Sequence, residues 1–245
     1  MPERSLIEQK ILRVAEAFSL NPGRALENAK HLKPLDSFVP SHILSWVNYY
    51  AIPSTSALAR VHFSEAIGSI DQHVQAVQLM LKKIAGARML HNQIPDLSGL
   101  HVGVKTVGAM HRIVDEQESD ILIVAAQLGM YHQYYDHNFV AFAQKSFAPN
   151  EFGLTSLAVG SILLSAYPQE FLMTEGRQNM NCPGDEFYGD YTGYSSPYFY
   201  FVGDKVWFGK TENRSDQDRV RPDGTGDIKC FGLRCAVASG FIPPF

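Results

Sequence analysis

The chain has 245 residues, of which 45% are hydrophobic and 19% are charged, and its formal net charge at pH 7 is -4. This balance is typical of a globular protein with a sizeable core, and it excludes disorder along the whole chain. The interspersed charges provide no basic field of the kind that sequence-independent nucleic-acid binding requires, so we expect no nucleic acid partner.

Targeting features are few. The longest apolar stretches, Ile121 to Met130 and Leu154 to Ala166, are shorter than the roughly 20 residues that cross a bilayer, so we expect no membrane span. The first residues show no Sec signal, which favours a cytoplasmic location but leaves incorporation into a virion or export by a non-Sec route open. The three cysteines are too few for a disulfide framework and fit a reducing compartment.

Apolar periodicity predicts that the first part of the chain, residues 1–167, is a helical body. Apolar side chains between residues 7 and 18 recur every three or four positions, which is typical of one face of a helix. The same criteria, with Pro residues between the segments, predict a second helix over 22–31 and a third over 42–51. We therefore expect the N-terminal part to supply the scaffold.

The longest predicted helix begins at the capping residues Ser54–Ser56 and continues to about Gly86. Its apolar positions alternate spacings of three and four residues, which forms one narrow seam of the coiled-coil kind. The seam consists of Phe63, Ala66, Ile70, His73, Val77, Met80 and Ile84. A partner helix should cover this seam, and a homo-oligomer could form through it.

The middle of the chain is less regular. Residues 92–100 are rich in Pro, Asp, Ser and Gly and predict a loop, and 101–107 alternate as a short strand does. The apolar run 121–127 fits a buried strand or the core of a helix, because periodicity does not distinguish the two in a short run, and we favour helix. Two further helices are predicted over 137–146 and 150–166.

Helical patterning then ceases, and residues 168–245 are predicted to form a smaller, aromatic-rich antiparallel β part. Residues 175–197 have no periodicity and predict a long ordered loop. Two aromatic runs, 198–202 and 205–208, flank a Gly-Asp pair in the manner of a tight hairpin, and a last strand is predicted over 228–239. The expected fold class is α+β, with the two parts compatible with packing as one domain.

Three aromatic or cysteine-containing segments stand out near the C-terminus: Ser195–Phe201, Val206–Phe208 and Phe231–Cys235. They resemble the final strands of C-type-lectin-like modules, which occur in bacterial and phage adhesins and in formylglycine-generating enzymes. The resemblance covers only the end of the chain. It implies that the loops beside these strands form a recognition surface.

The recognition surface implied by this resemblance contains Asp185, Tyr188, Asp190, Tyr191 and Tyr194. Tyrosine offers a large contact area at a low cost in conformational entropy, which suits recognition of a protein or a glycan partner. The alternative is that these tyrosines pack the loop onto the helices. A non-enzymatic binding protein that uses this aromatic, acidic loop is the function we expect.

An enzyme of an unfamiliar family is the alternative function. Cys182 lies in a predicted loop, and a thiol nucleophile needs a base such as His137, which Asp136 could orient. The residues around Cys182 carry no cysteine-protease or amidase signature. In this interpretation the same loop would form one wall of a pocket.

A metal site is the second form of this alternative. In a helix, His132 and Asp136 would share one face, and His62 and Glu65 on the long predicted helix could complete a set of imidazole and carboxylate ligands. The spacing matches no zinc or di-iron motif, and a histidine in an apolar seam, such as His73, is commonly a hydrogen-bonded core residue. We therefore expect no metal or other cofactor.

Overall fold

The protein is a mixed α/β structure in which helices pack on a large sheet. A computed structural model describes residues 5–63, 69–134, 139–166, 178–187, 195–202, 205–210 and 234–243. Within these residues, the main sheet has eight strands in the order β1-β4-β10-β6-β8-β9-β2, and β5 pairs with β10 outside this path. The pairs β10–β6 and β2–β9 are parallel and the others are antiparallel, so the sheet is mixed.

The described helices lie in the first two-thirds of the chain, interspersed with strands, and the last five described elements are strands. The strands of the main sheet are β1 (Asn48–Pro53), β2 (Met89–Asn92), β4 (Ile121–Tyr134), β5 (Glu151–Gly153), β6 (Gln178–Asn181), β8 (Pro197–Val202), β9 (Lys205–Lys210) and β10 (Arg234–Phe241). A second, two-stranded antiparallel sheet consists of β3 (Leu100–Val102) and β7 (Asp185–Phe187). The α-helices are α1 (Leu6–Phe18), α2 (Gly23–Ala29), α3 (Thr55–His62), α4 (Ser69–Ala87), α5 (Val104–Gln117), α6 (Phe139–Ser146) and α7 (Ser156–Ser165).

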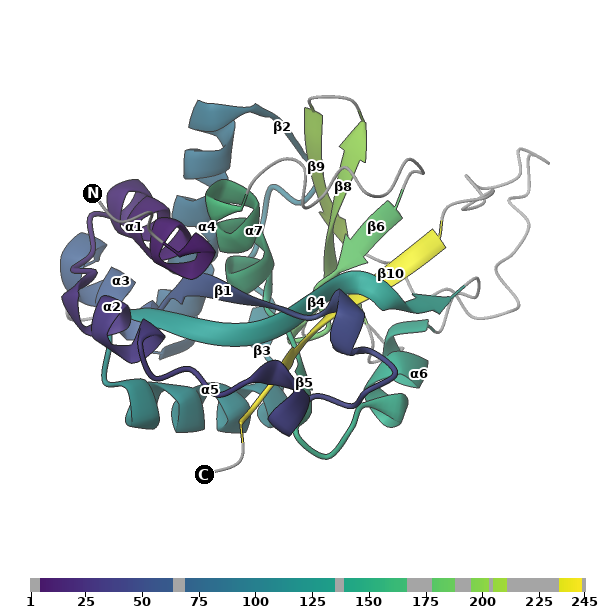
Figure 1. Cartoon of the computed structure of the whole chain (residues 1–245). Coiled ribbons are helices and arrows are strands. Elements are labelled where there is room, and N and C mark those ends of the chain that lie inside the picture. Colours follow the sequence, from purple (N-terminus) through teal and green to yellow (C-terminus); the bar gives the residue numbers. More distant parts are fainter. Residues whose placement is uncertain are drawn as a thin grey trace, which may run out of the picture.

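The helices lie on both sides of the main sheet. Figure 1 shows α1 and α7 on one side of β1 and β4, and α5 on the opposite side. Both α1 and α7 contact β1, and α4 contacts α7. None of the helices in the described residues is long and apolar enough to cross a membrane.

The first two helices confirm the periodicity of the sequence. A capping box starts α1, in which the Ser5 hydroxyl accepts a hydrogen bond from the Glu8 N–H and the Glu8 carboxylate accepts one from the Ser5 N–H. The apolar face of α1 is buried against β1 and α7. The second helix, α2, begins after Pro22 and lies inside its predicted range.

The predicted helix over 42–51 is wrong. A short 3₁₀ turn, Leu44–Trp46, is followed by strand β1, in which Tyr50 pairs with Val124 of β4. Tyrosine and isoleucine favour the extended conformation where a sheet can accept them, and the Tyr-Tyr-Ala-Ile run of β1 meets that condition. A helical body over 1–167 is therefore also wrong, because β1 already belongs to the sheet.

The predicted helix over 121–127 is also wrong, because this run is the buried start of β4. Its residues from Ile121 to Gln127 are all at most 4% exposed. The strand pairs with β1 on one edge and with β10 on the other, and helices cover both of its faces. A strand buried on both faces is a continuous apolar run without alternation, which explains why the sequence pattern did not distinguish it.

The long predicted helix is two helices. Helix α3 ends at His62, where Phe63 becomes extended, and α4 begins at Ser69. The seam residues Val77, Met80 and Ile84 are buried, and a Cβ on Gly160 of α7 would lie 2.1 Å from the Met80 sulfur. A helix covers the seam as predicted, but that helix belongs to the same chain. The seam residues Val77, Met80 and Ile84 are thus covered within the chain, and the side chains of Ala66 and Ile70 lie outside the described residues.

The bounds of three further elements differ from those predicted. Strand β3 spans Leu100–Val102 and so includes only the first two residues of the predicted strand over 101–107. Helix α5 begins after it, at Val104. Helix α6 lies within its predicted range. Strand β5 occupies 151–153, so Thr155 caps α7 through a hydrogen bond from the Ala158 N–H, whereas Asn150 donates to the Phe38 carbonyl. The sequence placed the helix correctly but not its start.

The aromatic hairpin is confirmed. Strands β8 and β9 pair in antiparallel register with Tyr200 opposite Trp207. Strand β10 overlaps the predicted last strand over 228–239 and extends beyond it to Phe241. The predicted loop over 175–197 contains strands β6 and β7, and its residues 188–194 lie outside the described part of the chain.

Two glutamine side chains complete the pairing of β4. The register between β4 and β10 shifts near Val237, and the Gln127 amide fills this irregularity by donating to the Val237 carbonyl (2.7 Å) and accepting from the Gly129 N–H (2.7 Å). Nearer the start of β4, the Gln117 amide bonds both the N–H and the carbonyl of Ile123, each at 2.7 Å. Because buried backbone groups require partners, these amides let β4 remain central.

Candidate functional site

Two of the predicted site residues, Cys182 and Asp185, lie in one buried turn between β6 and β7. The Asp185 N–H donates to the Cys182 carbonyl (3.0 Å), and the Cys182 N–H donates to the Pro197 carbonyl at the start of β8 (2.8 Å). Both residues are 0% exposed. We call residues 182–185 the buried turn.

The Asp185 carboxylate is bound from two helices. Its Oδ1 accepts a hydrogen bond from Nε2 of His73 on α4 (2.9 Å). Its Oδ2 accepts from the Ser156 N–H (2.7 Å) and from the Ser156 hydroxyl at the first residue of α7. The N-terminus of a helix favours a negative charge, and three donors compensate the loss of hydration. Asp185 thereby joins α4, α7 and β7 in the interior.

Close backbone contact brings the buried turn onto the start of α7. A Cβ on Gly184 would lie 2.5 Å from the Gly153 carbonyl oxygen and 2.7 Å from the carbonyl carbon of Leu154. A Cβ on Gly153 would in turn lie 2.6 Å from the Gly184 nitrogen. Glycine is the residue that allows two backbones to approach this closely.

Helices α5 and α6 also hold the buried turn. The Gly103 N–H, just before α5, donates to the Gly184 carbonyl (2.9 Å). The Gln144 amide of α6 donates to the Pro183 carbonyl (2.8 Å), and the Thr106 hydroxyl of α5 donates to the Gly153 carbonyl (3.0 Å). The turn is therefore fixed by contacts from several elements that are distant in sequence.

The environment of Cys182 does not favour a nucleophile. Burial, and next the negative charge of Asp185, raise the pKa of the Cys182 thiol well above its ordinary value. A catalytic thiol needs the opposite shift, together with access for a substrate. The enzyme interpretation based on Cys182 thus gains no support from this geometry.

Labelling of Cys182 by iodoacetamide is expected to be slow between pH 7 and pH 8. The thiol is neutral in this range because its pKa is raised, and the folded chain covers its sulfur. Mass spectrometry of the peptide that carries Cys182 measures the rate, with urea as the control that exposes the thiol. Rapid labelling without urea, at the rate of an exposed thiol, would contradict this expectation.

The prediction that Asp185 belongs to an exposed loop is wrong, because its carboxylate is fully buried on His73 and Ser156. The other predicted contact residues lie outside the described part of the chain: Tyr188, Asp190, Tyr191 and Tyr194. The two residues that border their segment are described. The Phe187 N–H donates to the Ser195 carbonyl (3.2 Å), so the two ends of the segment meet.

The predicted metal and acid–base residues are described only in part. The side chains of Glu65, His132, Asp136 and His137 lie outside the described residues. His132 belongs to β4, so the helical spacing assumed for its pair with Asp136 does not apply. Within the described ranges, no three His, Cys, Asp or Glu side chains gather as a metal site would require.

The observed role of His62 is different from metal binding. Its Nε2 lies 2.7 Å from the Phe18 carbonyl oxygen at the end of α1. Because a carbonyl only accepts hydrogen bonds, Nε2 carries the proton and donates it to one of the carbonyls that a helix end leaves unsatisfied. His62 therefore connects α3 to the C-terminus of α1.

A row of aromatic side chains crosses three strands, and the sequence pattern did not predict it. Tyr200 of β8 lies opposite Trp207 of β9, which lies beside His91 of β2. The ring centroids of His91 and Trp207 are 4.0 Å apart, and those of Tyr200 and Trp207 are 5.9 Å apart. The hairpin of β8 and β9 was predicted. The parallel pairing of β2 with β9 was not, because it joins residues that are distant in sequence and no local pattern indicates such a pairing.

Tyr198 extends this row. Its ring lies over Gly209, where a Cβ would approach the ring to 2.6 Å, and its hydroxyl donates to Gln93 (3.2 Å). We call the set His91, Tyr198, Tyr200 and Trp207 the aromatic row. All four side chains are exposed or partly exposed, whereas Phe199 and Phe208 alternate with them and are buried.

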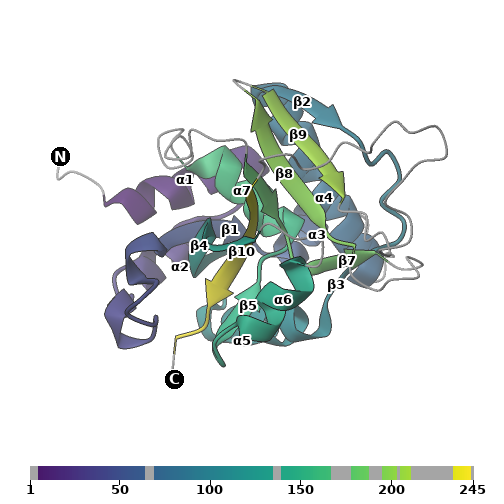
Figure 2. The same ribbon diagram turned by 90° about the vertical axis from the view of Figure 1, so that its right-hand side faces the viewer.

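The three strands that carry the aromatic row contain basic side chains. The sequences of β2, β8 and β9 contain Lys205, Lys210 and His91 and no Asp or Glu. The Lys210 ammonium lies 5.2 Å from the centre of the Phe187 ring, which borders the tyrosine segment 188–194. Figure 2 shows β2, β9 and β8 side by side with α4 behind them. The aromatic row and the ends of the tyrosine segment are thus neighbours.

Comparison with known proteins finds no matching family model, no matching curated protein and no matching solved structure. Function must therefore be argued from the residues of this chain and their geometry.

Proposed function

We propose that this protein is a binding protein that contacts a protein or a glycan through an aromatic surface near its C-terminus. The surface consists of the tyrosine segment 188–194 and the neighbouring aromatic row. The observation that supports the proposal is the way the segment is anchored: its ends, Phe187 and Ser195, are joined by a hydrogen bond directly beyond the buried turn.

The anchoring matters because ordering a loop on binding costs conformational entropy. A scaffold that already fixes both ends of a recognition segment reduces this cost. The segment itself is rich in tyrosine, with Asp190 as its single carboxylate, and such side chains combine a large apolar area with a polar tip. Asp185 has a structural role in this proposal, because it fixes the scaffold and does not touch the partner.

The proposal predicts that the double substitution Tyr191→Ala, Tyr194→Ala weakens partner capture without destabilising the protein. Loss of two central aromatic contacts is expected to weaken binding about tenfold or more. The immobilised protein is incubated with a cell extract and, separately, with a glycan array, and each variant's bound material and melting temperature are compared with those of the parent.

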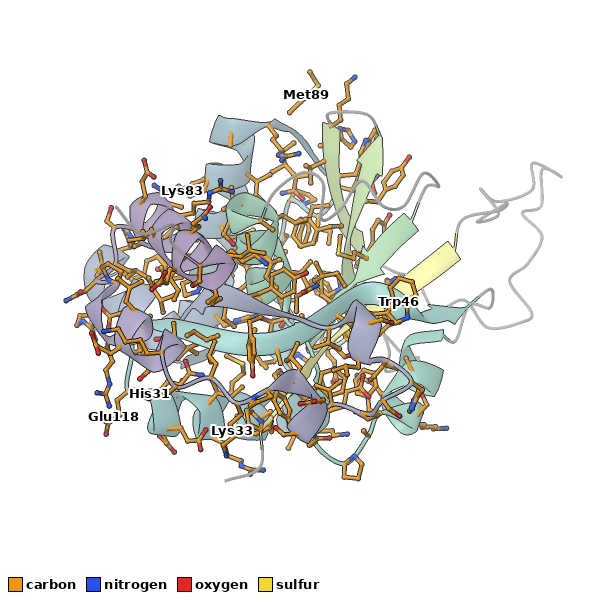
Figure 3. The ribbon with its side chains drawn as sticks, viewed as in Figure 1. His31, Lys33, Trp46, Lys83, Met89 and Glu118 are labelled. Carbon is orange, nitrogen blue, oxygen red and sulfur yellow. The ribbon has the colours of Figure 1, made fainter. Side chains whose placement is uncertain are left out.

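Trp46→Ala is the matched control, because Trp46 is an exposed aromatic residue (42%) on a different segment. Figure 3 shows its position. Unchanged capture by the tyrosine variant, or equal loss in the Trp46 variant, would contradict the proposal. A lower melting temperature with unchanged capture would show that the tyrosines pack the loop onto the body.

A further inference from the structure

Strand β2 forms one edge of the main sheet. Within the described residues it pairs only with β9, in parallel register from Met89 opposite Lys205 to Asn92 opposite Phe208. Met89 is 59% exposed, and its side chain points away from the molecule in Figure 3. His91 and Asn92 are exposed as well.

An edge strand presents backbone N–H and carbonyl groups that can pair with another strand. Proteins usually protect such edges by keeping the strand short or with a proline, an edge lysine or a bulge; Met89–Asn92 is short, with four residues, but contains no proline, lysine or bulge. The opposite edge differs: β1 ends in Pro53, and its residues Tyr50 to Pro53 are buried. The two edges of the sheet are therefore not equivalent.

The charged side chains near β2 determine which kind of chain can pair with this edge. Lys205 lies directly across from Met89, and His91 belongs to β2 itself. Since β2, β8 and β9 contain no Asp or Glu, an incoming chain with carboxylates meets complementary charge, whereas a basic chain meets only like charge. The aromatic row, which includes His91 and Trp207, lies next to the same edge.

We propose that the partner is a protein that contributes an extended acidic segment, which adds to β2 as a further strand of the sheet. This inference rests on the proposed function, because it assigns the aromatic row as the surface that the segment contacts. Backbone hydrogen bonds to β2 supply affinity. Alternate side chains of the segment lie towards the aromatic row, and its carboxylates lie near Lys205 and His91.

Synthetic peptides test the proposal directly. The probe is a short capped peptide of alternating Glu and Val with one central Tyr, titrated into the ¹⁵N-labelled protein. One control peptide replaces each Glu with Lys, and the other replaces the two central Val residues with Pro, which cannot donate backbone hydrogen bonds. We expect chemical-shift changes at the amides of Leu90–Asn92 and at the Trp207 indole with the acidic peptide, which should bind about tenfold more tightly than either control.

Reversal of the charge at residue 205 provides an independent test of the proposed acidic segment. Lys205→Glu should weaken binding of the acidic peptide at least about tenfold and improve binding of the lysine peptide. Lys30→Glu is the matched control, because Lys30 is an exposed lysine (57%) at the C-cap of α2, and this substitution should leave both affinities unchanged. Equal effects of the two substitutions would overturn the proposal.

The outcomes separate this inference from the proposed function. If a soluble oligosaccharide taken from the glycan array shifts the Trp207 indole while the acidic peptide shifts nothing, the binding function stands and the peptide partner is wrong. If the lysine or the proline peptide binds as well as the acidic one, strand addition with charge selection is overturned. If neither a peptide nor an oligosaccharide perturbs the aromatic row, both proposals fail.

Discussion

Replacement of Asp185 with alanine is expected to lower the free energy of unfolding by about 3 kcal/mol or more, because each buried donor left without its acceptor costs about 1–3 kcal/mol. The substitution leaves Nε2–H of His73 and both the N–H and the hydroxyl of Ser156 without their acceptor. These groups lie in the interior, where water does not replace the lost bonds. Urea denaturation followed by tryptophan fluorescence measures the change.

Two control variants test whether the loss of stability in Asp185→Ala comes from the lost hydrogen bonds. Asp185→Asn retains the shape of the side chain and one acceptor oxygen, but its amide nitrogen faces a donor, so it should recover only part of the loss. Asp36→Ala removes an exposed carboxylate and should leave the urea midpoint unchanged. If Asp185→Ala lowered the free energy of unfolding no more than Asp36→Ala does, the buried contacts of Asp185 would not contribute to stability.

Gly184→Ala is expected to destabilise the protein by about 3 kcal/mol, at the upper end of the range for overpacking. The new Cβ would lie 2.5–2.7 Å from backbone atoms of Gly153 and Leu154. Backbone atoms cannot rotate away as a flexible side chain can, so the buried turn and the start of α7 would have to separate. Thermal and urea unfolding measure the loss.

Gly108→Ala is the matched control for a glycine substitution. Gly108 is exposed in the middle of α5, and a Cβ there meets nothing within 4 Å. Alanine favours a helix over glycine, so this variant should gain about 0.5–1 kcal/mol. We therefore expect Gly184→Ala to lower the free energy of unfolding and Gly108→Ala to raise it. An unchanged free energy of unfolding in Gly184→Ala would contradict the close backbone contact.

The elements that could be predicted from the sequence are those that depend on local residues. Helix α1 has both an apolar face and a capping box within one segment, and the hairpin of β8 and β9 has its turn residues between two aromatic runs. The start of β4 could not be predicted in the same way. Burial on both faces removes its alternation, and its pairing with β10 depends on residues more than a hundred positions away.

The residues of the candidate site likewise divide into those whose role could be predicted from local sequence and those whose role depends on distant partners. His73 was expected to be a hydrogen-bonded core residue, and its bond to Asp185 confirms this. Asp185 itself was assigned to an exposed loop, because residues 175–197 show no periodicity and the C-type-lectin-like resemblance implies a recognition surface there. Its partners come from α4 and α7, and only the folded chain brings them together. One local signal was present: Gly153 and Gly184 mark the close backbone contact that buries the turn.

The place of β10 in the sheet has a consequence for how the chain folds. It is the last described strand along the chain, yet it lies between β4 and β6 in the middle of the sheet. Such distant pairings form only after long loops have closed, which predicts slow folding, on the order of milliseconds to seconds. During synthesis, β4 and β6 each keep an open edge until the residues of β10 emerge from the ribosome. In this interval the nascent chain is exposed to aggregation and to capture by chaperones.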